Sequence, residues 1–268
     1  DDAGQKAYHV RLNKDAVGSG GSKCRCELTV TGTDTRFEEW GTEEWMVFGF
    51  RFPSYWRSVS GGPFCLIAQF HDSPGGLTGG AMIDVEFVGG SGNASACKLQ
   101  STVKLYNNPY WPVNQDSKVK DNYDQAVADN ERNLAADTWH WVVLHYRSGN
   151  GHLDYPNYVN SGNWGAPDDT VYGPRDPDDV FVEMYHAVGD ALPTVAWRYD
   201  GFWGSPHAPG DPEAEKRRVG YWKTGIYTST SFDQNDDRHM YFKGLRVYRA
   251  SNAPGMTVFD VLRDFRGV

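Results

Sequence analysis

The sequence lacks any long hydrophobic segment, since no apolar run approaches the ~20 residues of a membrane-spanning helix. We therefore expect no membrane partner. It also lacks an excess of positive charge, because 35 acidic residues against 26 lysines and arginines give a formal net charge of -9. Nucleic-acid-binding domains normally carry a basic surface, so no nucleic-acid partner is expected. A local cluster of arginine, lysine and histidine can still attract an acidic ligand into a cleft.

Cysteines are few, and they leave the disulfide pattern open. Four cysteines allow three pairings, and they are Cys24, Cys26, Cys65 and Cys97. Cys24 and Cys26 are two apart on an expected strand, so we do not expect them to pair. The chain begins without an initiator methionine or a signal peptide, and Asn93-Ala94-Ser95 is a glycosylation sequon. We expect a mature secreted protein, extracellular or periplasmic, that is monomeric.

The pattern of apolar residues predicts an all-β protein. Short alternating segments are separated by clusters of Gly, Asn, Asp and Pro, which is typical of a sandwich or barrel. Neither an internal repeat nor a linker is evident, so residues 1–268 are expected to form one domain. The strand candidates are residues 23–30, 44–52, 64–71, 81–87, 139–147, 194–199 and 243–249. The segment 141–147 mixes apolar and polar residues and is expected to be covered on both faces.

Three segments are expected to depart from this pattern. Residues 121–136 are acidic and contain alanines, which favours a short helix. Residues 155–179 are rich in Asn, Gly, Pro and Asp, and predict a long surface loop that could form a groove wall. Residues 256–265 are expected to be a short helix or a last strand.

Three local motifs carry the side chains of a candidate site. They are Arg25-Cys26-Glu27, Gln69-Phe70-His71 and the segment from Tyr221 to Tyr227, which reads YWKTGIY. Residues two apart on a strand project from the same face. Gln69 would thus lie with His71, Arg25 with Glu27, and Lys223 with Tyr227. Gly225 would leave room for a ligand between the polar side chains of its strand.

This set of side chains suits β-elimination of a uronic acid. The reaction removes the C5 proton and expels the 4-linked oxygen. Arg25, Gln69 or Lys223 could neutralise the carboxylate as enolate-like charge develops. His71 could take the proton, because imidazole exchanges protons near neutral pH, and Tyr227 could protonate the leaving oxygen. Alternatively, Tyr227 could serve as base and then acid in a syn elimination, with His71 assisting.

These motifs resemble the polysaccharide lyase superfamily that contains heparin lyase I and glucuronan lyase. The Arg-x-Glu, Gln-x-His and Lys-x-Gly-Ile-Tyr segments occur in the family's order, and KTGIY is the most specific of them. The resemblance implies a two-sheet, concanavalin-like β-jelly roll with a concave substrate groove. It implies His71 as base and Tyr227 as acid. Arg25, Gln69 and Lys223, with Glu27 and Tyr221, would bind an acidic polysaccharide. The acidic composition is closer to the glucuronan members than to the heparin members.

Two other functions compete with this interpretation. The segment Met82-Ile83-Asp84-Val85-Glu86 is similar to the strand motif of laminarinase-like glycoside hydrolases, but Met82 stands where the first carboxylate is required. A lectin or carbohydrate-binding module would use the same aromatic residues without proton transfer. Each site residue also has a structural alternative, such as a cross-strand ion pair between Arg25 and Glu27.

No cofactor is required by this chemistry. His140 and His145 are five apart and would lie on opposite faces of a strand, so we expect no metal site there, and His145 is expected to be packed or to line the groove. The acidic turn with Asp233, Asp236 and Asp237 lacks the glycine and distal glutamate of an EF-hand loop. A structural calcium ion remains an open alternative.

Overall fold

The computed structural model describes the chain in separate stretches. These are residues 6–12, 23–29, 38–39, 41–54, 65–72, 81–88, 98–103, 132–148, 179–200, 218–229, 238–252 and 254–267.

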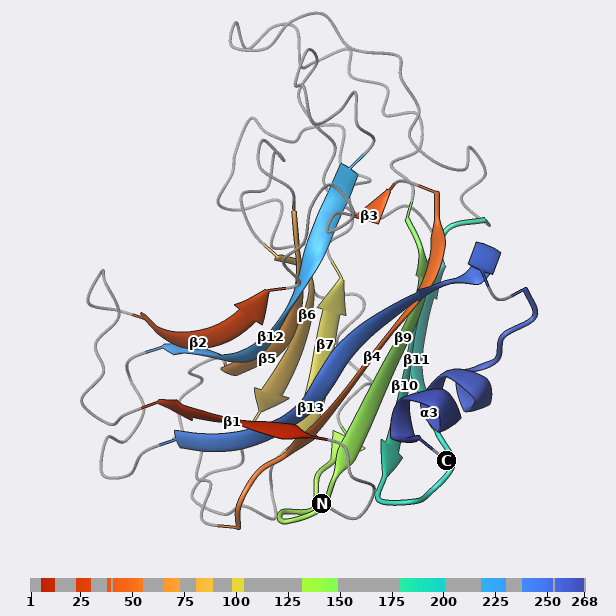
Figure 1. Cartoon of the computed structure of the whole chain (residues 1–268). Helices are drawn as coiled ribbons and strands as arrows, with labels where there is room; N and C mark the ends of the chain where they lie inside the picture. Colours follow the sequence, from red (N-terminus) through yellow and green to blue (C-terminus); the bar gives the residue numbers. More distant parts are fainter. Residues whose placement is uncertain are drawn as a thin grey trace, which may run out of the picture.

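Within these residues the secondary structure is almost entirely strand (Figure 1). The strands are β1 (Ala7–Leu12), β2 (Lys23–Thr29), β3 (Glu38–Glu39), β4 (Glu43–Arg51), β5 (Cys65–Asp72), β6 (Ala81–Val88), β7 (Lys98–Val103), β8 (Arg132–Asn133), β9 (His140–Arg147), β10 (Phe181–Val188), β11 (Thr194–Asp200), β12 (Arg218–Ser229) and β13 (Arg238–Arg249). They are followed by a 3-10 turn, η6 (Ala250–Asn252), and an α-helix, α3 (Val258–Arg266).

The strands form two antiparallel sheets that pack face to face. The six-stranded sheet has the order β1-β13-β4-β9-β10-β11. The seven-stranded sheet has the order β2-β12-β5-β6-β7-β8, and β3 also pairs with β12. Several neighbouring strands, such as β1 and β13 or β12 and β5, are far apart in sequence, as in jelly rolls. The chain is therefore an all-β, two-sheet jelly-roll sandwich, as expected.

The main core lies between the sheets because alternate residues of each strand point inward. Met46, Phe48 and Phe50 of β4 contribute from one sheet, and Phe70 and Trp222 contribute from the other. Trp222 donates its indole N–H to the Tyr146 hydroxyl at 2.8 Å. Tyr146 in turn donates to Glu44 at 3.0 Å, so these buried polar groups are satisfied.

A smaller core lies on the other side of the six-stranded sheet, beneath α3. Val47, Trp141 and Val143 pack there against Leu262 and Phe265 of the helix. Both faces of β4 and β9 are thus covered, which confirms the expectation for residues 141–147. No helix in the described part of the chain is long and apolar enough to cross a membrane.

All seven predicted strands are present, and six of them have boundaries within one residue of the prediction, whereas β13 begins five residues earlier than predicted. The C-terminal segment is a helix rather than a strand, with a capping box between Thr257 and Asp260. Residues 132–133 form β8, so a short helix within 121–136 cannot include them, and residues 121–131 lie outside the described residues. Residues 155–178 of the loop predicted over 155–179 also lie outside them. Strands β1, β3, β7, β8 and β10 were not predicted.

Candidate functional site

The three predicted motifs lie on neighbouring strands of the seven-stranded sheet. β12 pairs with β2 on one side and with β5 on the other, and the three run side by side in Figure 1. Tyr221 is directly opposite His71, and Lys223 is opposite Gln69. On the β2 side, Tyr227 is opposite Arg25. The fold therefore brings together segments that are about 200 residues apart in sequence.

The motif side chains share the face of this sheet that points away from the core, which we call the site face. Phe70, Trp222 and Ile226 belong to the core. The alternate positions on the same strands must point the other way. Gln69 and Lys223 are nonetheless only 3% and 8% exposed, so this face holds polar groups that are largely withdrawn from water.

His71, Tyr221 and Lys223 form a contiguous group on the site face. The rings of His71 and Tyr221 are 5.5 Å apart between centroids. The Lys223 ammonium lies 5.2 Å from the centre of the Tyr221 ring, within cation–π range. A potential base, a phenol and a cation therefore lie next to one another in space, across β5 and β12.

Gln69 is held in place by Glu27, which lies two strands away. The Gln69 side-chain amide donates a hydrogen bond to the Glu27 carboxylate. Glu27 is opposite Gly225 on the intervening strand, so no β12 side chain stands at that level. Because the amide nitrogen of Gln69 points toward Glu27, this hydrogen bond also fixes the direction of the Gln69 amide oxygen.

Gly225 has a different role from the one expected. Its backbone has φ +146°, and a Cβ there would lie 2.2 Å from the Cys26 carbonyl oxygen and 2.7 Å from the Glu27 Cα. The space is thus filled by the backbone of β2. The expectation that this glycine leaves room for a ligand is wrong, because β2 approaches β12 too closely.

Tyr227 stands at a different level of the site face from His71. It is opposite Leu66 on β5, five residues from His71, which corresponds to about 16 Å along a strand. Its other neighbour is Arg25, whose side chain lies outside the described residues. The phenol that the fold places beside His71 is therefore Tyr221, and a ligand would have to lie along the strands to meet both His71 and Tyr227.

Two carboxyl groups of β6 extend the site face beyond Gln69. Asp84 is opposite Gln69, and Glu86 is opposite Leu66. Burial, together with the nearby charge of Asp84, raises the pKa of Glu86 to about 7. The sequence marks these residues by their alternation with Ile83 and Val85, but their place beside Gln69 depends on the strand order.

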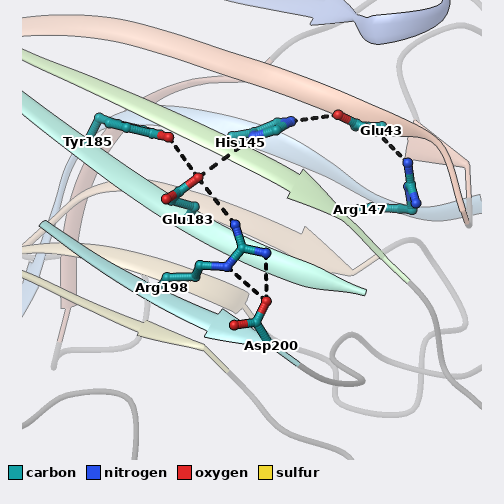
Figure 2. Close-up of polar contacts among 7 residues, drawn as sticks. All are labelled: Glu43, His145, Arg147, Glu183, Tyr185, Arg198 and Asp200. Atoms are coloured by element: carbon teal, nitrogen blue, oxygen red, sulfur yellow. Dashed lines mark hydrogen bonds and ion pairs between the residues drawn. The ribbon is translucent and has the colours of Figure 1, made fainter. Parts of the chain in front are cut away.

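A second polar cluster lies on the outer face of the six-stranded sheet, on the opposite side of the sandwich (Figure 2). His145 contacts Glu43 at 2.8 Å and lies 3.9 Å from Glu183. Its ring also stacks on Trp45, with centroids 3.6 Å apart. Burial lowers the pKa of His145 more than the Glu43 bond raises it. His145 is packed, as expected, but it lies on the opposite face of the sandwich from the candidate site.

The rest of this cluster consists of ion pairs. Arg147 pairs with Glu43, and Arg198 pairs with Asp200 at 2.7 Å and with Glu183 at 3.6 Å. Each described carboxylate in Figure 2 has a cation or a histidine beside it. Such a balanced network fits a structural role that joins β4, β9, β10 and β11.

Metal ligands do not converge in the part of the chain that the structure describes, where no group of three His, Cys, Asp or Glu side chains could hold an ion. The acidic turn with Asp233, Asp236 and Asp237 lies outside the described residues. Cys26 carries a free thiol, so it is not bridged to Cys24.

Comparisons with known proteins agree on the fold. No family model matches the sequence, and no curated protein matches it. Among solved structures, a marine PL7 alginate lyase from Zobellia galactanivorans matches with a TM-score of 0.50 and 12% identity, over 93% of this chain and 81% of that one. At this identity the likeness shows the jelly-roll fold alone.

Two further matches have lower scores. The endo-β-1,4-glucuronan lyase from the fungus Trichoderma reesei matches with a TM-score of 0.41 and 16% identity, over 91% of this chain and 88% of that one. The catalytic domain of a GH131 β-glucanase from Podospora anserina matches with a TM-score of 0.48 and 12% identity, over 95% of this chain and 74% of that one. Both TM-scores are below 0.5, so we draw no conclusion from these two matches. The choice between lyase and hydrolase chemistry depends on the residues of the site face.

Proposed function

We propose that this protein is a polysaccharide lyase that cleaves a uronic-acid-containing polymer by β-elimination. The observation that supports the proposal best is the group of His71, Gln69, Lys223 and Tyr221 on one face of two paired strands. Tyr227 is on the same face further along β12. A binding module has no need for a base and phenols beside a cation and an oriented amide.

The proposed reaction starts with the substrate carboxylate against Lys223 and Gln69. Their hydrogen bonds strengthen as negative charge moves onto the carboxylate, which makes the C5 proton more acidic. His71 accepts that proton. The electron pair of the broken C–H bond forms the C4–C5 double bond, and the C4–O4 bond breaks. Tyr221, the phenol beside His71, donates its proton to the departing oxygen, which leaves a new hydroxyl end and an unsaturated uronate end.

The substrate that we favour is a glucuronan-like polymer. The chain has a net charge of -9, and the site face itself carries Glu27, Asp84 and Glu86. A highly sulfated polymer would be repelled by such a surface more than a polymer with one carboxylate per sugar. No cofactor takes part in the proposed steps, and the protein would act as a secreted monomer.

A glycoside hydrolase is the second candidate, and one observation favours it. Glu86 lies beside Asp84, and its pKa is raised to about 7, as suits the general acid of a carboxylate pair. Met82 still occupies the position of the first carboxylate in that motif. The hydrolase would therefore have to work with Asp84 and Glu86 alone.

One assay separates these functions. The protein is incubated with glucuronan, alginate, pectate, hyaluronan and heparan sulfate, and the ultraviolet absorbance of unsaturated uronate is followed. Neutral β-glucans are run beside them with a reducing-sugar readout. We expect absorbance to rise on glucuronan and to stay flat with His71→Ala. New reducing ends from a neutral glucan, lost in Glu86→Gln but kept in His71→Ala, would contradict the lyase and support the hydrolase.

A further inference from the structure

The outer face of the six-stranded sheet carries a row of alternating aromatic and cationic side chains. The row consists of His9 on β1, Tyr241 and Lys243 on β13, Arg51 on β4, and Trp139, which precedes β9. These residues lie at one end of the sheet, and the ion-pair cluster of Figure 2 lies at the other. The helix α3 covers the middle of the face.

Each member of the row contacts the next one along it. The His9 ring stacks on Tyr241 at 4.7 Å between centroids. The Arg51 guanidinium lies 5.0 Å from the Tyr241 ring centre and 5.6 Å from that of Trp139. The Lys243 ammonium lies 4.8 Å from the Trp139 ring centre. The row thus crosses three strands and ends on the chain segment before β9.

The row differs from the other end of the face in its charge balance. Within the described residues, Arg51 contacts two rings and no carboxylate. The outward positions of β1 and β13 beside it are Ala7, His9, Arg11, His239, Tyr241 and Lys243, among which there is no acidic residue. Arg147 and Arg198, by contrast, each pair with carboxylates.

A half-buried guanidinium between two rings has N–H donors that an incoming carboxylate can occupy. Arginine holds a carboxylate through two parallel hydrogen bonds, and it does so more strongly where water is partly excluded. Aromatic rings at the same place offer apolar faces and edges for the C–H face of a sugar. An acidic sugar combines both features, and a neutral sugar or a free inorganic anion only one.

We propose that this row is a second, non-catalytic binding site for a polyuronate chain, on the opposite side of the sandwich from the site face. Arg51 would bind a uronate carboxylate, and Tyr241 and Trp139 would pack against the sugars beside it. The identity of the polymer rests on the proposed function, but the site itself depends only on Arg51 and its rings. A site of this kind would keep the enzyme on a long chain between cleavage events.

Affinity electrophoresis tests the proposal, with polyglucuronate or alginate cast in the gel and neutral dextran as the reference. The proteins are the unmodified chain, Arg51→Gln, Tyr241→Ala and Arg51→Lys, with Arg147→Gln as the matched control from the other end of the same face. We expect Arg51→Gln to raise the Kd for polyuronate about tenfold, as for loss of one charge-assisted hydrogen bond. Tyr241→Ala should weaken binding similarly, and Arg51→Lys less. Arg147→Gln should bind like the unmodified chain.

The lyase assay separates this proposal from the proposed function. Retardation that is lost in Arg51→Gln and kept in His71→Ala supports the second site, even if no uronan is cleaved. Arg51→Gln should leave kcat on short uronate oligosaccharides unchanged. Equal retardation of Arg51→Gln, Tyr241→Ala and the unmodified chain would overturn the second site, even if the protein proves to be a lyase. A melting curve for each variant identifies any that fails to fold, and Arg51→Lys keeps the test decisive in that case.

Discussion

The side-chain amide of Gln69 on β5 donates a hydrogen bond to the Glu27 carboxylate on β2, across the intervening strand β12. The two residues lie on strands that are not paired with each other, and β12, which lies between them, carries Gly225 opposite Glu27. An amide held by a carboxylate has a fixed orientation, with its oxygen and nitrogen distinguished. Glu27 is therefore a positioning residue for Gln69 in the proposed reaction.

Glu27→Ala should reduce kcat/KM on the cleaved uronan by about tenfold or more, because loss of a charge-assisted hydrogen bond leaves Gln69 unanchored. Glu27→Gln keeps an acceptor oxygen and should recover much of the activity. The melting temperature of both variants is measured beside the kinetics. If the two variants lose activity equally while staying folded, the charge of Glu27 matters for another reason than its bond to Gln69.

The two tyrosines of β12 can be distinguished by removing one hydroxyl at a time. Tyr221→Phe should abolish turnover and leave binding of the substrate largely intact, because the proposed proton donor is lost while the ring contacts with His71 and Lys223 are kept. Tyr227→Phe removes a hydroxyl whose residue lies about 16 Å along the strand from His71, and it should lower kcat only modestly. Single-turnover rates and equilibrium binding measure the two effects. The opposite ranking would make Tyr227 the proton donor.

Gly225→Ala should destabilise the protein by about 2–4 kcal/mol, since the added methyl meets the β2 backbone and the residue has an unfavourable φ. The matched control is Gly255→Ala. Gly255 also has positive φ, +78°, but a Cβ there meets no atom within 4 Å, so only the backbone cost of about 1 kcal/mol applies. Urea unfolding of both variants measures the difference. Equal losses would mean that β2 moves aside without cost.

The strands of this fold were predictable where apolar residues alternate strongly, as in Met46, Phe48 and Phe50 of β4. Strand β10 was missed because Glu183 and His186 interrupt its apolar pattern. Both are mostly buried in the structure, where His186 contacts His140 and Glu183 accepts a hydrogen bond from the Tyr185 hydroxyl. Such polar residues enter an interior through partners that lie far away in sequence. Single-strand periodicity cannot supply those partners.

The sequence could predict which residues of the candidate site share a face of their own strand, but not which residues of other strands lie beside them. Periodicity placed Gln69 with His71, and Lys223 with Tyr227, on shared faces. The adjacency of β2, β12 and β5 was not predicted. Strand order and register in an antiparallel sheet are long-range properties, so the contact between Tyr221 and His71 and the closeness of Asp84 to Gln69 required the structure.

Acid should weaken the protein through the buried pair His140 and His186. His140 donates through Nε2 to the Ala135 carbonyl at 2.8 Å, so its Nδ1 accepts from His186 Nε2 at 3.1 Å. Burial lowers the pKa of His140 below its usual value of 6.5. The unfolded chain therefore binds more protons as pH falls below about 6.5, and the free energy of unfolding falls with it. His140→Asn should show a smaller fall between pH 7 and 5 in urea titrations than exposed His9→Asn.

Glu86 should act in the opposite direction on stability. Its pKa is raised from 4.5 to about 7, so the folded protein binds more protons than the unfolded chain between those values. The free energy of unfolding therefore falls as pH rises through this window, by up to about 3 kcal/mol. Glu86→Gln stays uncharged and should be more stable than the unmodified chain at pH 8 and nearly equal to it at pH 4. Asp84→Asn is the companion variant, because removal of that charge should lower the pKa of Glu86. A Glu86→Gln variant that is less stable at pH 8 than the unmodified chain would show that the ionised carboxylate is held by favourable contacts, and the hydrolase role of Glu86 as an acid near neutral pH would lose its basis.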